Sequence, residues 1–229
     1  MEIVPGVHWL KSNVSQCYFV VDEGITLIDT GMPHKTKTIV RYITEDLQRT
    51  PSDLKTILLT HCDIDHIGNA SQLRDFTGAK IAAHPQDAEI IAGKKKRMTP
   101  KGGMSILFNL LGSFMRMKPF NVDILVNEGD NISGFTVLHM PGHTPGSIAL
   151  YDSKRKVLFI GDTLGCKDGI VQGPSKNVTI DMKQAYRSIE KLSNLDFTVM
   201  LSGHGDPLKK NASSLVTEFI EKMKLKNMY

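Results

Sequence analysis

Runs of apolar residues divide the first third of the chain into predicted strands, and a longer apolar period marks a predicted helix between them. The strand-like runs lie at residues 3–10, 17–22, 25–28 and 54–59. Between residues 35 and 49, isoleucine or leucine recurs at every fourth position, which predicts a surface helix with one buried stripe. The chain therefore begins with a β-meander, followed by a helix and a strand that is buried on both faces.

The rest of the chain repeats this order of elements without a repeat in its sequence. Further strands are predicted at 80–83, within 124–150, at 157–160 and at 197–201. Helices are predicted at 68–76, 86–92 and 182–192, and over the apolar face formed by residues 215–223. Two halves of this kind predict the α/β class, with two α/β layers facing one another. Loops at the C-terminal ends of several strands can then meet at one edge.

The loop after the strand at 54–59 carries four candidate metal ligands. His61, Asp63, Asp65 and His66 lie within six residues, between an apolar run and Gly68. Neutral imidazole and carboxylate both suit zinc, iron and manganese, and aspartate is rarely buried unless it is paired. This spacing predicts a metal site.

Three later loops carry histidine or aspartate in a similar context. His143 lies in a turn with proline and glycine on both sides, Asp162 follows the strand at 157–160, and His204 stands between two glycines after the last predicted strand. A strand-end histidine or aspartate often only caps a turn, so each loop alone is a weak signal. Together with the loop at 61–66 they predict one shared centre.

Composition and charge narrow the class of protein. The chain has 229 residues, 41% of them hydrophobic and 23% charged, which suits one large domain or two small ones. Its three cysteines lack CxxC spacing, so neither a disulfide framework nor a cysteine zinc site is indicated. The net charge of +4 comes from residues 94–120, which hold seven lysines and arginines and no acid, and does not by itself indicate nucleic-acid binding. With neither a signal peptide nor a transmembrane run evident, we expect a soluble, cytoplasmic protein.

The four loops together resemble the metallo-β-lactamase superfamily, whose pattern is HxHxDH, a PGHTPG-like loop, an aspartate after a strand and a GHG-like loop. The resemblance covers nearly the whole chain and implies a four-layer αββα sandwich. It also implies a single domain over residues 1–229, made of two pseudo-symmetric halves (1–93 and 121–229) with an insertion at 94–120.

The resemblance implies two adjacent divalent metal ions that share a bridging carboxylate. The first site would consist of His61, Asp63 and His143, the second of Asp65, His66 and His204, with Asp162 as the bridge. Asp29, which ends the strand at 25–28, would support the ligands from behind. His8, His34, His84 and His139 have no matching partner in this pattern, and we expect them to be structural or exposed.

Position 63 departs from the family pattern, because it holds aspartate where histidine is usual. A carboxylate still binds zinc, but it adds a negative charge and a harder oxygen donor. Zinc is therefore the first expectation, with manganese or iron as alternatives, and a partly filled site or a non-catalytic relative stays open.

The ligand set implies hydrolysis by a hydroxide that bridges the metals, with Asp65 as the catalytic proton carrier to the leaving group. We expect cleavage of a lactone, ester or thioester with an apolar acyl group. The alternatives are a glyoxalase II-like thioesterase, a mononuclear iron dioxygenase of the same fold, and a non-catalytic metal-binding protein. Cys62 is expected to be a small buried side chain rather than a catalytic group.

Two segments are candidates for choosing a small-molecule substrate. Residues 104–117 are apolar at most positions, so a helix there must bury more than one face, as a lid, a homodimer interface or a membrane contact. The glycine-rich segment 164–177 is the other expected substrate wall. No nucleic-acid partner and no transmembrane segment are expected.

Overall fold

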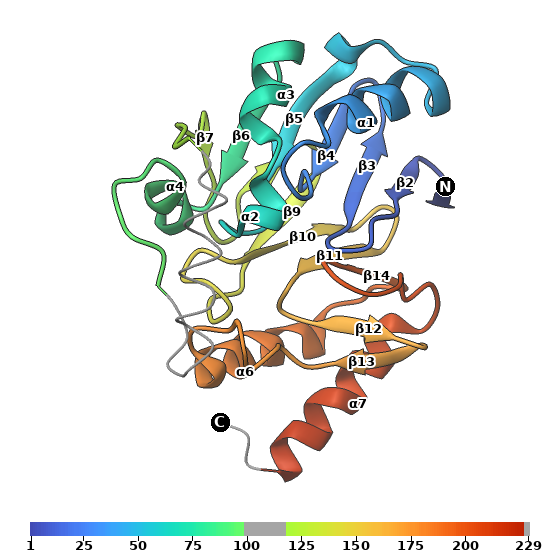
Figure 1. Ribbon diagram of the computed structural model, residues 1–229. Coiled ribbons are helices and arrows are strands. Elements are labelled where there is room, and N and C mark those ends of the chain that lie inside the picture. Colours follow the sequence, from blue (N-terminus) through green and yellow to red (C-terminus); the bar gives the residue numbers. More distant parts are fainter. Residues whose placement is uncertain (99–117, 227–229) are drawn as a thin grey trace.

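The computed structural model describes residues 1–98 and 118–226, and it consists of two facing β-sheets with helices on both outer sides (Figure 1). The predicted segment 104–117 lies outside the described residues. The predicted four-layer αββα arrangement is confirmed. No helix in the described part of the chain is both long enough and apolar enough to cross a membrane.

The first sheet comes from the N-terminal half, apart from its last strand, which follows residue 120, and contains, within the described residues, seven strands in sequence order. They are β1 (Glu2–Val4), β2 (Val7–Leu10), β3 (Cys17–Val21), β4 (Ile25–Ile28), β5 (Leu54–Leu58), β6 (Lys80–Ala83) and β7 (Ile124–Leu125). The strands β1 to β4 pair antiparallel, whereas β4 to β7 pair parallel. Parallel pairing requires crossover connections between the strands. The helices of the N-terminal half are α1 (Thr36–Arg41), α2 (Ile64–Ile67), α3 (Ala70–Thr77) and α4 (Pro85–Ile91).

The second sheet comes from the C-terminal half and has the order β14-β11-β10-β9-β8. Its strands are β8 (Asn131–Ile132), β9 (Phe135–His139), β10 (Ile148–Asp152), β11 (Val157–Gly161) and β14 (Val199–Ser202). Only β11 and β14 pair parallel, with Val157 opposite Val199. The remaining elements are the hairpin β12 (Gly165–Lys167) and β13 (Ile170–Gln172), and the helices α6 (Met182–Glu190) and α7 (Ala212–Leu225).

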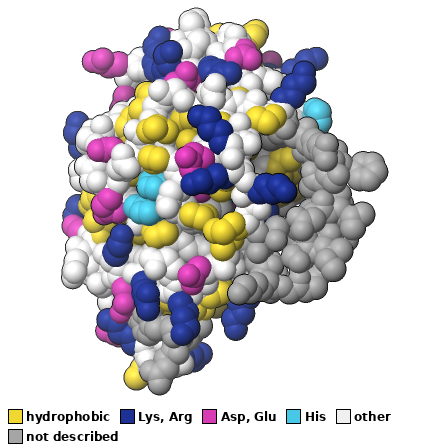
Figure 2. Space-filling model, turned by 90° about the vertical axis from the view of Figure 1, so that its left-hand side faces the viewer, with side chains coloured by type: hydrophobic (Ala, Val, Ile, Leu, Met, Phe, Trp, Pro, Cys, Tyr) yellow, Lys and Arg dark blue, Asp and Glu magenta, His cyan; other side chains and the backbone are white. Residues whose placement is uncertain are grey.

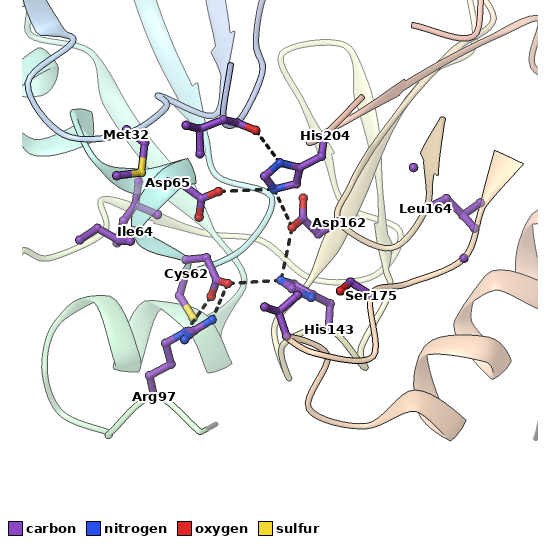
Figure 3. Close-up of a pocket in the computed structure, with 16 residues that line it drawn as sticks. Met32, Cys62, Ile64, Asp65, Arg97, His143, Asp162, Leu164, Ser175 and His204 are labelled. Atoms are coloured by element: carbon purple, nitrogen blue, oxygen red, sulfur yellow. Dashed lines mark hydrogen bonds and ion pairs between the residues drawn. The ribbon is translucent and has the colours of Figure 1, made fainter. Parts of the chain in front are cut away.

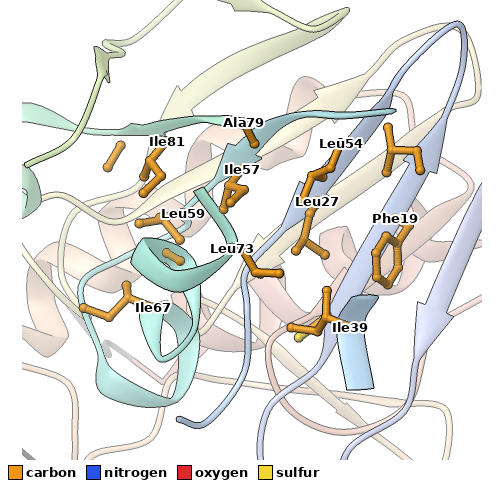
Figure 4. Packing of buried hydrophobic residues seen from close by; sticks show 14 of the residues in the cluster. Phe19, Leu27, Ile39, Leu54, Ile57, Leu59, Ile67, Leu73, Ala79 and Ile81 are labelled. Carbon is orange, nitrogen blue, oxygen red and sulfur yellow. The ribbon is translucent and has the colours of Figure 1, made fainter. Parts of the chain in front are cut away.

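Alternation along the strands separates the core into distinct interlayer clusters. In β3 and β4, Phe19 and Leu27 face the helices α1 and α3, whereas Tyr18 and Ile28 face the second sheet. Figure 4 shows the outer cluster, where Phe19, Leu27 and Ile57 of the strands pack with Ile39 and Leu73 of the helices. A corresponding cluster packs β10, β11 and β14 against α6 and α7. Each sheet is therefore covered on both faces, as its apolar runs require.

Two predicted elements are interrupted in the structure. The strand predicted at 3–10 is split into β1 and β2, because Gly6 adopts a φ of +76° in the turn between them. The helix predicted at 35–49 is α-helical only from Thr36 to Arg41 and continues as a π-helical turn, Tyr42–Asp46. The predicted stripe is preserved, since Ile39 and Ile43 are fully buried and Leu47 packs against the same cluster.

The charged side chains do not separate into regions of one sign on the face shown in Figure 2. Positive and negative side chains are interspersed there, with apolar side chains between them. The described residues of this face thus form no broad basic surface.

Candidate metal centre

The ends of four strands in the two sheets deliver the candidate ligands to one place (Figure 3). His61 follows β5, and Asp63 stands directly before the short helix α2, which carries Asp65 and His66. The other ligands come from the second sheet: His143 from the loop between β9 and β10, Asp162 after β11, and His204 after β14. All seven side chains predicted from the sequence lie together.

Asp29 holds the two histidines of the first loop in place. One of its oxygens lies 2.8 Å from His66 Nδ1 and accepts the hydroxyl of Thr60 at 2.7 Å. Its other oxygen accepts the backbone N–H of Thr60 at 2.8 Å. The Thr60 hydroxyl in turn lies 3.0 Å from His61 Nδ1. Asp29 is 3% exposed, so this support is buried.

The other two histidines are also fixed through Nδ1. The Nδ1 of His143 lies 3.5 Å from the Thr179 hydroxyl, and that of His204 lies 2.6 Å from the backbone carbonyl of Val14. A carbonyl can only accept a hydrogen bond, so His204 donates from Nδ1 and keeps the Nε2 lone pair free. The segment around Val14 is a support that sequence reasoning missed.

The four Nε2 atoms surround the carboxylate of Asp162. Its oxygens lie 3.1 Å from His204 Nε2, 3.3 Å from His66 Nε2, 3.7 Å from His143 Nε2 and 4.0 Å from His61 Nε2. Burial acts to raise the pKa of Asp162, but the nearby imidazoles outweigh it and hold the pKa well below its usual range. The centre therefore contains an ionised carboxylate at a position suited to bridge two cations.

Three buried polar atoms in the described part of the chain support a metal at this place. The atoms that have no hydrogen-bond partner are His61 Nε2, His143 Nε2 and Asp162 Oδ1. Leaving a buried acceptor unpaired costs about 1–3 kcal/mol, so such atoms call for a partner that the protein does not supply. All three point into the centre, and imidazole and carboxylate suit a divalent cation.

The described side chains form two separate ligand groups by distance, and His61, His66 and Asp162 form a third group that overlaps both. The first ligand group is His61, Asp63 and His143, and the second ligand group is Asp65, His66 and His204. Within each group, one ligand atom of every residue lies within 4.8 Å of the others. The division is the one predicted from the sequence, while the roles of these residues as ligands stay a proposal.

Arg97 forms a two-pronged ion pair with Asp63, which sequence reasoning missed. Its Nε donates to Asp63 Oδ1 at 2.8 Å, and its Nη2 donates to Asp63 Oδ2. From the sequence, residues 94–97 are the basic start of the insertion at 94–120, and a contact between Arg97 and the metal loop was not expected. One sequence signal was present, because Arg97 is the only arginine after three lysines and arginine is suited to paired contacts with a carboxylate.

Asp87 is a second residue that sequence reasoning missed. This carboxylate of α4 is 0% exposed and accepts the backbone N–H of Cys62 at 2.8 Å, the Thr144 hydroxyl at 2.7 Å and the backbone N–H of Gly146 at 2.8 Å. A Cβ at position 146 would lie 2.6 Å from its Oδ1, so glycine permits this close approach. Asp87 therefore ties the loop of His61 to the loop of His143.

The remaining predicted residues are outside the ligand groups. Cys62 is 5% exposed, and burial raises the pKa of its thiol well above the usual value, in keeping with a small buried side chain. The rings of His84 and His139 stack on each other with their centroids 4.0 Å apart, so these two histidines do have a partner, although a structural one. His139 Nε2 lies 2.9 Å from the carbonyl of Pro145, in the loop that carries His143.

A pocket with a volume of about 730 Å³ opens over the centre. Its apolar lining consists of Val14, Met32, Ile64, Ile67, Leu164 and Val178. In Figure 3, Met32 and Ile64 lie on one side of the centre and Leu164 lies on the other. Four residues of the segment expected to form a substrate wall line the pocket: Leu164, Gly165, Gly173 and Ser175.

Comparison with known proteins identifies the family. The family model described as the metallo-β-lactamase superfamily matches residues 12–204. The chain is 29% identical over 247 residues to the probable metallo-hydrolase YflN of Bacillus subtilis, covering 97% of this chain and 92% of that protein. It is 32% identical over 157 residues to the hydroxyacylglutathione hydrolase GloC of Haemophilus influenzae, covering 67% of this chain and 69% of that protein.

Solved structures agree on the fold. TTHA1623 in a di-iron-bound form superposes with a TM-score of 0.67 at 25% identity, covering 91% of this chain and 95% of that one. The subclass B3 metallo-β-lactamase BJP-1 of Bradyrhizobium japonicum gives a TM-score of 0.70 at 21% identity, covering 99% and 91%. The histidine and aspartate cluster at the expected loops supports a metal-dependent hydrolase. With this cluster and its αββα layers, the chain belongs to the metallo-β-lactamase superfamily.

Proposed function

We propose that the protein is a dinuclear metallohydrolase that cleaves a lactone, ester or thioester carrying an apolar acyl group. The observation that carries this proposal is the pair of ligand groups around Asp162 at the base of an apolar pocket. Two divalent metal ions held by these groups would activate water at neutral pH and polarise the carbonyl of the substrate. The side chains of the protein would have to bind the acyl group and carry the proton.

Asp65 is the proposed proton carrier. Its carboxylate lines the pocket, with a side chain that is 20% exposed and lies 3.4 Å from His204 Nε2 and 3.6 Å from His66 Nε2. It is therefore close to the centre and still open to the space that a substrate would fill. A carboxylate in this place can hold a proton and pass it to the oxygen or sulfur of the leaving group.

The pocket supports an apolar acyl group. Six aliphatic or thioether side chains face the space over the ligands, on both sides of the centre. In the described part of the chain, Arg97 is the only lysine or arginine that lines the pocket, and Asp63 already engages its guanidinium. Acyl chains would bury their surface against these walls and gain about 0.8 kcal/mol for each buried methylene.

A glyoxalase II-like thioesterase is the second candidate, because the relative GloC is named as a hydroxyacylglutathione hydrolase. Thioesters are within the proposed substrate class. The glutathione part would require cationic partners for its carboxylates, and the described pocket offers none that is unpaired. The structure TTHA1623 is described with two irons, which supports testing iron beside zinc and manganese.

The test is metal analysis of the purified protein together with a panel of lactones, esters and thioesters whose acyl chains increase in length. We expect about two equivalents of divalent metal and turnover that rises with acyl length. Glutathione thioesters and a persulfide with an oxygen electrode belong in the same panel. Preferred turnover of the glutathione thioester would favour the thioesterase, and oxygen consumption with the persulfide would favour an iron dioxygenase.

A matched pair of variants separates the role of Asp65 from a general loss of charge. The variant Asp65→Asn should lose most turnover on the best substrate, whereas Asp75→Asn, an exposed carboxylate on α3, should keep it. Two bound metals without turnover on any member of the panel would contradict the proposed function.

A further inference from the structure

Asp63 occupies the position at which the family pattern has a histidine, and the structure shows what accompanies that change. Both carboxylate oxygens of Asp63 accept a hydrogen bond from the guanidinium of Arg97. The residue is 8% exposed, so this ion pair lies inside the centre rather than on the surface. A carboxylate and a guanidinium together carry no net charge. In this respect the pair is like a neutral imidazole.

The ion pair leaves Asp63 able to bind a cation at the same time. Each carboxylate oxygen has two lone-pair directions, and the fork of Arg97 takes one on each oxygen. Asp63 Oδ2 still lies 3.4 Å from His143 Nε2 and 3.9 Å from His61 Nε2, on the side of the first ligand group. In Figure 3, Arg97 lies at the lower left of the centre and His143 at its lower right.

We propose that Arg97 is a positioning residue that makes Asp63 a ligand with the net charge of a neutral histidine. This inference rests on the proposed metal-dependent function. The fork fixes the rotation of the carboxylate, and the positive charge offsets the negative charge that Asp63 adds to the first ligand group. Arg97 therefore offsets the part of the expected shift toward manganese or iron that comes from charge, while the harder oxygen donor of Asp63 remains.

Arginine suits this role better than lysine. A guanidinium is planar, remains charged and presents two parallel N–H donors that match a carboxylate, whereas an ammonium is a flexible point charge. Arg97 also spans two environments. Its side chain is 33% exposed and lines the pocket, whereas its guanidinium reaches the carboxylate of Asp63, which is almost fully buried.

A double-mutant cycle tests the inference through metal binding rather than activity. The measurement is competition between the full-length protein and a chromophoric chelator for zinc and, separately, for manganese. In Asp63→His, Arg97 becomes an unpaired cation beside the metal, and we expect the affinity of the first ligand group for zinc to fall about tenfold or more. In Asp63→His with Arg97→Met, the cation is gone, and the affinity should recover.

The single variants separate charge from geometry. Arg97→Met leaves the negative charge of Asp63 uncompensated, so manganese should gain on zinc relative to the wild type. Arg97→Lys keeps the charge and loses the fork, so its ratio of zinc to manganese affinity should stay close to that of the wild type. The control is Arg74→Met, which removes an arginine that pairs with Asp75 on α3 outside the centre, and it should change neither affinity.

Two outcomes would overturn the inference. If Arg97→Met does not change the metal affinity of Asp63→His, Arg97 is a bystander. If Arg97→Met alone abolishes zinc binding and the double variant does not recover it, Arg97 only supports the loop. The cycle is independent of turnover. If the wild type hydrolyses the panel while the effects of the two substitutions on metal affinity are additive, only this inference is contradicted. If the protein binds metal without turnover, only the proposed function is contradicted.

Discussion

The two ligand groups differ in how the protein surrounds them. In the first group, His61 and His143 have side chains that are 1% exposed, and Asp63 is held by Arg97. In the second group, the side chain of His204 is 44% exposed and that of Asp65 is 20% exposed. The first group is thus the more enclosed, whereas the second combines the buried His66 with the more exposed Asp65 and His204. Each group contributes two residues to the lining of the pocket. We infer that the second group is the more accessible to a substrate.

The largest effect is expected when both groups are broken together. The double variant His61→Ala, His66→Ala removes one ligand from each group and also two contacts of Asp162. Metal content should fall to about a tenth of the wild type or less, and turnover should fall with it, because each ligand-deficient group loses much of its affinity. Elemental analysis after dialysis checks this, with His8→Gln as the control. Unchanged metal content would show that the centre lies elsewhere.

The next effect concerns Asp87, which joins the loops of the enclosed group. Asp87→Ala leaves the backbone N–H groups of Cys62 and Gly146 buried without an acceptor, at about 1–3 kcal/mol each, whereas the Thr144 hydroxyl can still donate to Ser147 Oγ at 2.8 Å. We expect the free energy of unfolding to fall by about 4 kcal/mol in a urea titration, and Asp87→Asn to lose less, because it keeps one acceptor oxygen.

The control for this prediction is on the same helix. Glu89 carries a 45% exposed carboxylate that pairs with Lys95, so Glu89→Gln should change the free energy of unfolding by less than about 0.5 kcal/mol. Equal loss in the Asp87 and Glu89 variants would remove the argument that Asp87 fixes the enclosed group.

A smaller effect should distinguish the groups from each other. His204→Ala removes an exposed ligand, so it should weaken one metal equivalent by about tenfold to a hundredfold and leave the other equivalent unchanged. His143→Ala should instead weaken the equivalent held by the enclosed group. Stepwise titration with zinc checks both variants. If both weaken the same equivalent, the division into two groups is wrong.

The smallest expected effect is a pH dependence in the support of the His143 loop. Burial, together with the adjacent His139, lowers the pKa of His84 to about 4, below its ordinary value of 6.5. Between these two pH values the unfolded chain binds a proton that the folded chain does not bind, so stability falls as the pH is lowered from 6.5 to 4.

His84→Asn keeps a good cap for α4 and removes this titration. The fall in the free energy of unfolding across this window should then shrink by on the order of 1 kcal/mol. Denaturation in urea at several pH values measures it. The exposed His34, changed to Asn, serves as the control, and the same shrinkage there would assign the effect to histidine loss in general.

Local patterns predicted the strands, the helices and the loops that carry the candidate ligands, whereas the four-layer arrangement and the division into ligand groups followed from the resemblance to the family. Alternation in β3 and β4 separates the two faces of the first sheet, and a strand followed by a short polar loop places His61, Asp162 and His204 at strand ends. The split of the first strand at Gly6 was also local, and the Pro5-Gly6 dipeptide is a turn signal that the prediction of one continuous strand missed.

Arg97 and Asp87 could not be predicted, because their roles depend on contacts between distant parts of the chain. Arg97 pairs with a residue 34 positions earlier, and Asp87 accepts from Gly146, 59 positions later. Before folding, each is an ordinary charged residue in or beside a predicted helix. Only the packing of α4 against the loops of both sheets turns them into supports of the centre.

The place of Arg97 has a thermodynamic consequence. The guanidinium contacts Asp63 and also lines the pocket, so a cation at the first ligand group and a molecule in the pocket act on the same side chain. Linkage then requires reciprocity: if a pocket ligand that engages Arg97 changes the affinity for the cation by some factor, the cation changes the affinity for that ligand by the same factor. A metal titration with and without the ligand, and a ligand titration with and without the metal, would thus give the same coupling free energy.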